Sequence, residues 1–219
     1  MRSVLVTGGT RRLGAAIAAH LRTRGWRVLT SSHRPEAGAD LVADLSEPGG
    51  AARLYAATMG LLGGVPPDAL VNNAALYTGD AAKVRTVDFE APQKLTILMA
   101  GRETNRGAVV NILDANLPDG ATPYRAAKRA LAAETVRQAA LFAETLRVNA
   151  VAPGPVLPPE GLHEKAVETP LGHPTPAAVA AAVAVLLEAD YTTGAILPVD
   201  GGANSGEATF PSLCVKTIL

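Results

Sequence analysis

Short apolar runs rich in β-branched residues alternate along the chain with longer, alanine-rich amphipathic stretches. The short runs predict strands at Ser3–Thr7, Arg27–Ser31, Asp40–Ala43, Ala69–Asn72, Ala108–Ile112, Arg147–Ala152 and Ala195–Val199. The amphipathic stretches predict helices near Arg12–Arg24, Ala51–Leu62, Phe89–Glu103, Tyr124–Ala143 and Pro176–Glu188. This alternation is typical of βαβ units around a parallel sheet. The pattern therefore predicts a doubly wound α/β fold.

Two stretches lie outside the alternation. Ala152–Pro174 holds six prolines and three glycines, which predicts a long loop after a strand, and such loops in compact domains often serve as lids. The last residues, Gly206–Leu219, show no periodicity. We therefore expect one domain over residues 1–205 and a C-terminal tail over residues 206–219.

Length and charge narrow the classes of function. The 219 residues are enough for one α/β domain with a substantial core. Lys and Arg number 20, as do Asp and Glu, so nothing in the charge favours nucleic acid or an anionic membrane as partner. The apolar runs are too short to span a bilayer, and a strand-like segment begins at Ser3, which argues against a secretory signal. We expect a cytoplasmic protein that acts on a small molecule.

The few cysteine and histidine residues predict no metal site. Cys214 is the single cysteine, and the four histidines show no metal-ligand spacing.

A glycine-rich turn follows the first predicted strand and precedes the first predicted helix. It reads Thr7-Gly8-Gly9-Thr10-Arg11-Arg12-Leu13-Gly14. Such a turn brings backbone N–H groups close to a pyrophosphate at the positive end of a helix. Its position in a βαβ pattern predicts a dinucleotide site. The cofactor-binding residues expected here are Gly8, Thr10, Arg11, Arg12, Leu13 and Gly14.

The end of the second predicted strand indicates which dinucleotide binds. About 20 residues past the glycines, NAD-binding folds place an acid on the ribose hydroxyls, whereas this chain has Ser31-Ser32-His33-Arg34. Arg34, with Arg11 or Arg12, is suited to hold a 2′-phosphate through charge-assisted hydrogen bonds. We predict NADPH as cofactor, with His33 and Arg34 in its site. The alternative is that the arginines only solvate a loop.

Polar residues also stand at the ends of the third and fourth predicted strands. They are Asp44-Leu45 and Asn73-Ala74-Ala75, and ligands of open sheets bind at the carboxyl ends of strands. We expect all five residues to contact the cofactor, with Asn73 also holding the backbone. The alternative is that Asn and Asp only form turns here.

Motifs that follow one another along nearly the whole chain resemble those of the short-chain dehydrogenases/reductases. They are Thr7-Gly8-(three residues)-Arg12-Leu13-Gly14, Asn72-Asn73-Ala74, Tyr124-(three residues)-Lys128, Val148-Asn149-(two residues)-Ala152-Pro153-Gly154, and Thr193-Gly194 with Val199-Asp200-Gly201-Gly202. The resemblance implies a single domain with a Rossmann-type, doubly wound, seven-stranded parallel sheet, assembled as a homotetramer or dimer. It also implies cofactor contacts by Pro153, Gly154 and Val156.

Within that family the chain is most similar to the pteridine reductases, including dihydromonapterin and dihydrofolate reductases of this fold. Arg12 stands where most members have the middle glycine of the turn, and His33-Arg34 resembles the NADPH-selective segment of pteridine reductases. Asp114 stands where the usual catalytic serine would be, as in pteridine reductases. The resemblance implies hydride transfer from NADPH to a pteridine-like substrate.

Tyr124 and Lys128 are the candidate reacting pair. Four residues apart, they share one face of a predicted helix. A tyrosine titrates near 10 in water, so we expect a cationic Lys128 to lower its pKa. Tyr124 would then supply the proton, and the resemblance implies that Lys128 binds the nicotinamide ribose. A carboxylate at Asp114 can accept hydrogen bonds from the ring N–H and amino groups of a pterin, or donate one if protonated. The alternative for Asp114 is a strand-end turn residue.

Asp88 departs from the family pattern. It stands where the family commonly has an asparagine that organises a water relay to the lysine. An aspartate there can accept from that water, yet it adds negative charge near Lys128. The alternative is that Asp88 is the N-cap of the following helix.

Two other functions stay open. The first is a carbonyl or 3-oxoacyl reductase, because fold alone does not fix the substrate. The low aromatic content of 4% leaves few side chains to stack on a pterin, with Tyr77 and Phe89 as candidates. The second is a non-catalytic dinucleotide-binding protein, which Asp88 and the short connecting segments suggest and which the presence of both Tyr124 and Lys128 argues against.

Overall fold

One seven-stranded sheet organises the molecule. The computed structural model describes residues 1–102, 106–115, 122–156 and 169–203. The strands are parallel, in the order β3-β2-β1-β4-β5-β6-β7. They are β1 (Ser3–Thr7), β2 (Arg27–Ser32), β3 (Leu41–Val42), β4 (Ala69–Asn72), β5 (Gly107–Ile112), β6 (Leu146–Pro153) and β7 (Ile196–Val199). Each expected strand is present, and the predicted doubly wound α/β fold is confirmed.

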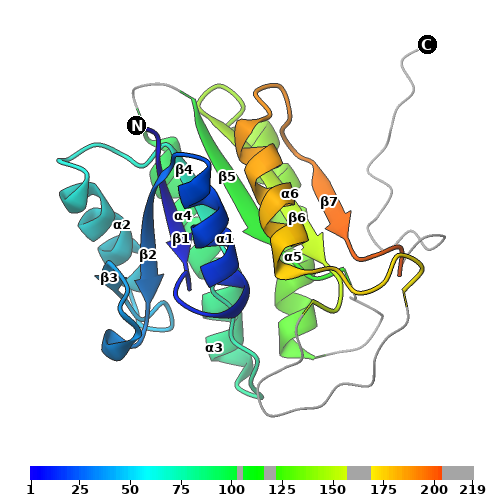
Figure 1. Cartoon of the computed structure of the whole chain (residues 1–219). Coiled ribbons are helices and arrows are strands. Elements are labelled where there is room, and N and C mark those ends of the chain that lie inside the picture. Colours follow the sequence, from blue (N-terminus) through cyan, green and yellow to red (C-terminus); the bar gives the residue numbers. More distant parts are fainter. Residues whose placement is uncertain (103–105, 116–121, 157–168, 204–219) are drawn as a thin grey trace.

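Helices cover both faces of the sheet, as Figure 1 shows. Helices α1 (Arg12–Thr23) and α6 (Pro176–Glu188) pack on one face, and α2 (Gly50–Leu61), α4 (Ala91–Ala100) and α5 (Pro123–Leu141) pack on the other. Successive strand residues point to opposite faces. In β1, Val4 and Val6 therefore contribute to the core under α1 and α6, and Leu5 contributes to the core under α2 and α4.

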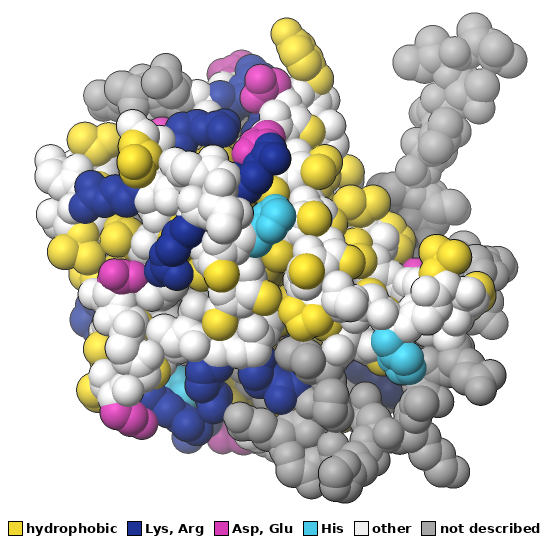
Figure 2. All heavy atoms as spheres, in the orientation of Figure 1, with side chains coloured by type: hydrophobic (Ala, Val, Ile, Leu, Met, Phe, Trp, Pro, Cys, Tyr) yellow, Lys and Arg dark blue, Asp and Glu magenta, His cyan; other side chains and the backbone are white. Residues whose placement is uncertain are grey.

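The chain order places a crevice at the carboxyl ends of the central strands. From β1 the chain proceeds outward to β2 and β3, and it then returns to add β4 on the other side of β1. The connections after β1 and β4 therefore leave in opposite directions. In open α/β sheets such a switch point is where ligands bind. Figure 2 shows Lys and Arg side chains gathered below α1, along the edge where these strands end.

One predicted helix begins earlier than the sequence suggested. The helix expected from Phe89 is preceded by α3 (Ala81–Arg85) and by a π-helical turn, η2 (Thr86–Glu90), which leads directly into α4. The Asp80 side chain caps α3 by accepting from the Lys83 N–H at 3.0 Å. Pro92 has no N–H and conflicts with the carbonyl four residues earlier in an α-helix. The wider turn of η2 accommodates this proline inside a continuous helical run.

Two expectations fall on residues that are not described. The segment expected to be a lid, Ala152–Pro174, includes residues 157–168, and the tail covers residues 206–219; both ranges lie outside the described chain. The described ends of the first segment are joined, because His173 Nδ1 lies 3.1 Å from the Pro155 carbonyl oxygen. Among the described helices, none is both long and apolar enough to cross a membrane.

Candidate active site

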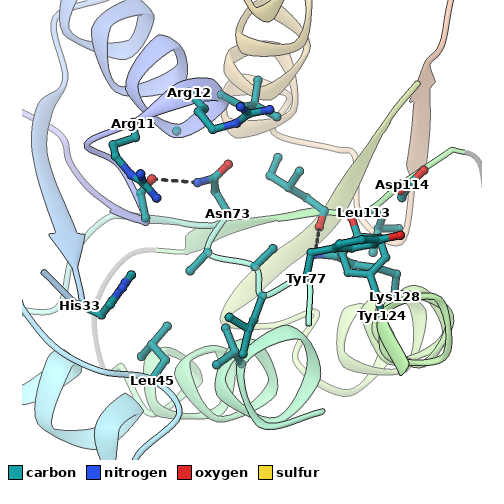
Figure 3. A pocket seen from close by; sticks show the side chains of 18 of the residues that line it. Arg11, Arg12, His33, Leu45, Asn73, Tyr77, Leu113, Asp114, Tyr124 and Lys128 are labelled. Carbon is teal, nitrogen blue, oxygen red and sulfur yellow. Dashed lines mark hydrogen bonds between the residues drawn. The ribbon is translucent and has the colours of Figure 1, made fainter. Parts of the chain in front are cut away.

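A cleft of about 1020 Å³ runs along the carboxyl ends of the strands. With the exception of Arg34, every residue that the sequence predicted for catalysis or cofactor binding lines it. These residues are Gly8, Thr10, Arg11, Arg12, Leu13, Gly14, His33, Asp44, Leu45, Asn73, Ala74, Ala75, Asp114, Tyr124, Lys128, Pro153, Gly154 and Val156. Figure 3 shows Arg11, Arg12 and His33 at one end and Tyr124 with Lys128 at the other. Residues from the ends of six strands, β1 to β6, therefore meet in one elongated site.

The glycine turn after β1 is packed against the end of β4. Asn73 Nδ2 donates to the carbonyl oxygens of Thr7 at 2.9 Å and Gly8 at 3.1 Å. The Thr7 hydroxyl accepts from the backbone N–H groups of Asn73 and Ala74, each at 3.0 Å. A Cβ at Gly14 would overlap the Gly8 carbonyl oxygen and the Asn73 amide. Glycine is therefore required at position 14 for α1 to pack this closely on the turn. Such a close turn at the start of a helix is typical of a pyrophosphate site.

Arg12 occupies a conformation that suits glycine. Its φ is +50°, and among the described residues it is the one non-glycine residue with a positive φ. An arginine held there carries about 1–3 kcal/mol of backbone strain. Arginine thus replaces the usual glycine at a position where the backbone still has the positive φ that favours glycine.

We expect Arg12→Gly to raise the free energy of unfolding of the cofactor-free protein by about 1 kcal/mol, because the strain disappears. The measurement is urea denaturation. Arg11→Gly is the matched control, since Arg11 is extended, with φ −138°, and glycine there only adds chain entropy to the unfolded state. Equal responses of the two variants would contradict the strain argument.

The end of the cleft beside β2 is polar and basic. Ser31, Ser32 and His33 line it together with Lys83 of α3. Asp44 is also present, and hydrogen bonds from the side chain and the backbone N–H of Ser46 hold the pKa of its carboxyl below the usual range. The carboxylate is thus engaged with its own turn.

Arg34 is not part of this lining. Proline at position 35 begins a 3₁₀ turn, η1 (Pro35–Ala37), and it holds Arg34 extended, at φ −102° and ψ 119°. His33 lines the cleft, and Arg34 contacts it from outside the lining, because its Nε donates to His33 Nε2 at 3.3 Å. In the proposal below, Arg11 and His33 contact the 2′-phosphate directly.

The reacting end is built by the first turns of α5 and the residues after β5. Thr122 caps α5 by accepting from the Arg125 N–H at 3.3 Å, and Pro123 follows at the first position. Tyr124 donates a hydrogen bond from its hydroxyl to the Asp114 carboxylate. Lys128 Nζ lies 5.5 Å from the centre of the Tyr124 ring. Although residues 116–121 between them are not described, Asp114 and Tyr124 meet.

The electrostatics at Tyr124 differ from the expectation that Lys128 would lower its pKa. Burial, and then the negative charges of Asp114 and Asp88, raise the pKa of the Tyr124 phenol far above its ordinary value. Besides the lysine that the sequence places near Tyr124, the fold brings two carboxylates to it. In the cofactor-free site, Tyr124 is therefore a firmly protonated phenol.

Asp88 is not a helix N-cap. It lies within η2, where its Oδ1 is 3.2 Å from Lys128 Nζ, and its Oδ2 accepts from the Leu76 N–H at 2.8 Å. Lys128 also donates to the Ile112 carbonyl oxygen at 3.0 Å. Burial raises the pKa of the Asp88 carboxyl above its usual range, and Lys128 and the Leu76 N–H offset only part of this effect. The cap of this helical run is Asp80, as described above.

Of the two aromatic candidates for stacking, one lies in the cleft. Tyr77, on the connection after β4, is 70% exposed and packs edge-on against Tyr124, with ring centres 5.2 Å apart. Phe89 instead packs beside the core cluster of α5 and β6, below the Arg85 guanidinium. Sequence reasoning missed Lys83, Leu113 and Arg125 as lining residues. For Leu113, its position next to a strand end was an available signal.

Known proteins resemble this chain over nearly its whole length. A family model described as enoyl-(acyl carrier protein) reductase matches residues 8–204. An uncharacterised oxidoreductase of Mycobacterium bovis is 30% identical, over 92% of this chain and 96% of its own. The 3-oxoacyl-(acyl-carrier-protein) reductase MabA of the same organism is 29% identical, over 94% of each chain.

Two solved structures share the fold closely. FolM alternative dihydrofolate reductase 1 from Brucella canis, complexed with NADP, has a TM-score of 0.81 and 28% identity, over 100% of this chain and 98% of its own. The Brucella suis protein of the same name, also in complex with NADP, has a TM-score of 0.82 and 28% identity, over 97% and 99%.

Proposed function

This chain is an oxidoreductase of the short-chain dehydrogenase/reductase family, and we propose that it uses NADPH to reduce a pteridine-like substrate of the dihydropterin or dihydrofolate kind. The observation that carries the proposal is Asp114, a carboxylate in the cleft, in hydrogen-bond contact with Tyr124. A carboxylate there accepts from the ring N–H and amino groups of a pterin, which a serine hydroxyl does less well.

The cleft fits NADPH at both ends. A Cβ at Gly14 would overlap the Gly8 carbonyl oxygen and the Asn73 amide, so glycine lets α1 begin directly against the turn, and its N-terminus lies at the cleft, where a pyrophosphate can bind. At the β2 end, Arg11 supplies positive charge for a 2′-phosphate and His33 lies beside it as a polar contact, and Asp44 is engaged by Ser46. The solved NADP complexes of the two Brucella proteins support the same choice.

Each residue at the reacting end has a distinct task in the proposal. NADPH supplies the hydride when it is bound. Tyr124 breaks its O–H bond and delivers the proton to the substrate, directly or through water. Asp114 orients the substrate by accepting its N–H groups, and the exposed ring of Tyr77 provides an apolar surface for a planar heterocycle. Lys128 holds its ammonium beneath the Tyr124 ring and is positioned to bind the cofactor ribose.

A 3-oxoacyl or other carbonyl substrate is the second candidate. The similarity to MabA favours it, and it requires only Tyr124 and Lys128. Asp114 distinguishes the two candidates, because a ketone offers no N–H group to a carboxylate. The third possibility, a dinucleotide-binding protein without activity, is disfavoured by the contact of Tyr124 with Asp114 and Lys128 in one cleft.

The test is NADPH oxidation, followed by the loss of near-ultraviolet absorbance. Dihydrobiopterin and dihydrofolate are compared with an acetoacetyl thioester and a diketone, and NADH replaces NADPH in a parallel series. We expect turnover of the pteridines with NADPH preferred. Turnover of the carbonyl substrates alone would exclude the pteridine assignment, and tight NADPH binding without turnover of any substrate would support the third possibility.

Replacing Asp114 by the residue common in the family sharpens the test. Asp114→Ser is expected to lower pteridine turnover by about tenfold to a hundredfold, the loss of one or two charge-assisted hydrogen bonds. Because Tyr124 and Lys128 stay in place, carbonyl reduction is expected to persist or rise. Equal losses on both substrate classes would mean that Asp114 serves the chemistry in general and does not select the pteridine.

A further inference from the structure

A buried ion pair lies beneath the reacting tyrosine. The side chain of Lys128 is 3% exposed and that of Asp88 is 0% exposed, with 3.2 Å between Nζ and Oδ1. The other Asp88 oxygen accepts the Leu76 N–H at 2.8 Å, and the lysine also donates to Ile112 O at 3.0 Å. The pair therefore joins α5, η2, the end of β5 and the connection that carries Tyr77.

The backbone explains how the carboxylate reaches this place. Asp88 is the middle residue of η2, the π-helical turn before Pro92. This turn packs against both α4 and α5. An N-cap at this position would have directed the side chain to backbone N–H groups of its own helix. The wide turn instead lets Asp88 project to Lys128 on the neighbouring helix.

Burial makes the two charges dependent on each other. Removing an ammonium or a carboxylate from water costs several kcal/mol, which an opposite charge in good geometry offsets. Because the Lys128 side chain is 3% exposed, water stabilises its charge very little, and Asp88 provides the opposite charge. The hydrogen bond from the Leu76 N–H favours the ionised form of Asp88. The contacts with Lys128 and the Leu76 N–H stabilise the carboxylate form of Asp88, in which the pair has a net charge near zero.

We propose that Asp88 is a positioning residue that holds Lys128 in this pair and cancels its charge, so that Tyr124 keeps its proton until the substrate takes it. The inference rests on the proposed function, in which Tyr124 is the proton donor. A neutral asparagine at this position would leave the ammonium uncompensated, and the tyrosine would tend towards phenolate. Asp88 therefore biases the site towards reduction, which needs a phenol, over oxidation of an alcohol or amine, which needs a base.

The charged surroundings of Tyr124 agree with this account. The ionisable groups that raise its pKa are Asp114 after β5, Asp88 in η2 and Tyr77 after β4. Lys128 lies 5.5 Å from the centre of its ring, and Arg125 of the same helix also lines the cleft. Asp88 is one of the groups that raise the pKa of Tyr124. Of the cations near Tyr124, Lys128 is the one that pairs with Asp88, at 3.2 Å.

The test is a tyrosinate titration of the full chain without cofactor or substrate. The chain has four tyrosines, so each variant is measured beside its Tyr124→Phe counterpart, and the difference reports Tyr124. In the native protein Tyr124 is expected to ionise well above the ordinary value of about 10. In Asp88→Asn its ionisation is expected to fall by about 1–3 pH units. An unchanged ionisation of Tyr124 would overturn the proposal.

A second variant guards against failure of Asp88→Asn to fold. Asp88→Asn with Lys128→Met replaces both charges by neutral groups, a change that proteins often tolerate. Because the pair is neutral as a whole, Tyr124 should ionise as in the native protein. A markedly lowered ionisation in this double variant would overturn the proposal, since no uncompensated ammonium would be left to cause it.

A control on the same helix excludes a general effect of charge. Glu134 of α5 is also buried, yet it pairs with Arg137 at 2.6 Å and Gln93 at 2.9 Å. Glu134→Gln should leave the Tyr124 titration unchanged, and an equal shift in this variant would overturn the specific role of Asp88. The titration uses neither substrate nor cofactor, so failure of the pteridine assignment would appear in the turnover assay alone.

Discussion

Tyr124→Phe is expected to lower the turnover of the best substrate by about 10²–10⁴-fold, the range of a general acid. The substitution removes the hydroxyl that donates to Asp114 and keeps the ring that packs against Tyr77. NADPH affinity should stay nearly constant, because the glycine turn and the basic end of the cleft are untouched. Steady-state turnover and NADPH binding by fluorescence titration measure the two effects separately.

Two other tyrosines provide matched controls. Tyr77→Phe keeps an aromatic ring in the cleft and removes a hydroxyl that the proposal does not use. Tyr191→Phe changes a fully exposed residue outside the cleft lining. Both variants should keep turnover within a fewfold of the native protein. Unchanged turnover in Tyr124→Phe would remove this residue from the mechanism.

The second large effect is expected at the glycine turn. In Gly14→Ala the new methyl group would overlap the Gly8 carbonyl oxygen and the Asn73 amide. Relieving such overpacking costs about 1–3 kcal/mol. If the turn moves to make room for the methyl group, we expect NADPH affinity to fall by roughly tenfold to a hundredfold, because the displaced backbone is the proposed pyrophosphate site. Calorimetric titration with NADPH measures the loss.

Gly60→Ala is the control for this variant. Gly60 is an exposed glycine within α2, and no atom lies within 4 Å of its Cβ position. Alanine there should raise the free energy of unfolding by up to about 1 kcal/mol and leave NADPH binding unchanged. Native NADPH affinity in Gly14→Ala would show that the turn is not the pyrophosphate site.

The strands could be predicted from the sequence because buried parallel strands are continuous β-branched runs. Val4-Leu5-Val6 and Val109-Val110 have apolar side chains on both faces, and both faces are covered by helices. The glycine turn, with Asn73 beside it, could be predicted as well, since a close approach of backbone to backbone restricts the residue types allowed.

The helix before β5 could not be placed correctly. Pro92 is a strong signal for the first turn of a helix, and Asp88 is a suitable N-cap, so both residues favoured a start near Phe89. The structure instead carries the helical run through Pro92 by widening one turn. A π-helical turn is a response to tertiary packing, which single-residue preferences do not contain.

The composition of the site was easier to predict than its electrostatics. Tyr124 and Lys128 follow from their four-residue spacing and Asp114 from the resemblance to the pteridine reductases, and the structure brings all three to the cleft. The direction of the Tyr124 pKa shift depends on the partner that Lys128 takes and on the depth of burial. Both depend on contacts between segments distant in the sequence, such as Asp88 with α5. The extended backbone of Arg34 likewise goes with the single proline that follows it.

The difference in burial between the two ends of the cleft determines how each responds to dissolved ions. Arg11 and His33 are exposed at the cofactor end, within reach of a counter-ion atmosphere whose screening length is about 8 Å at physiological ionic strength. The side chains of Lys128 and Asp88 are almost wholly buried, so this screening reaches them far less. We therefore expect added salt to weaken the proposed binding of the dinucleotide and to change the proposed proton transfer much less.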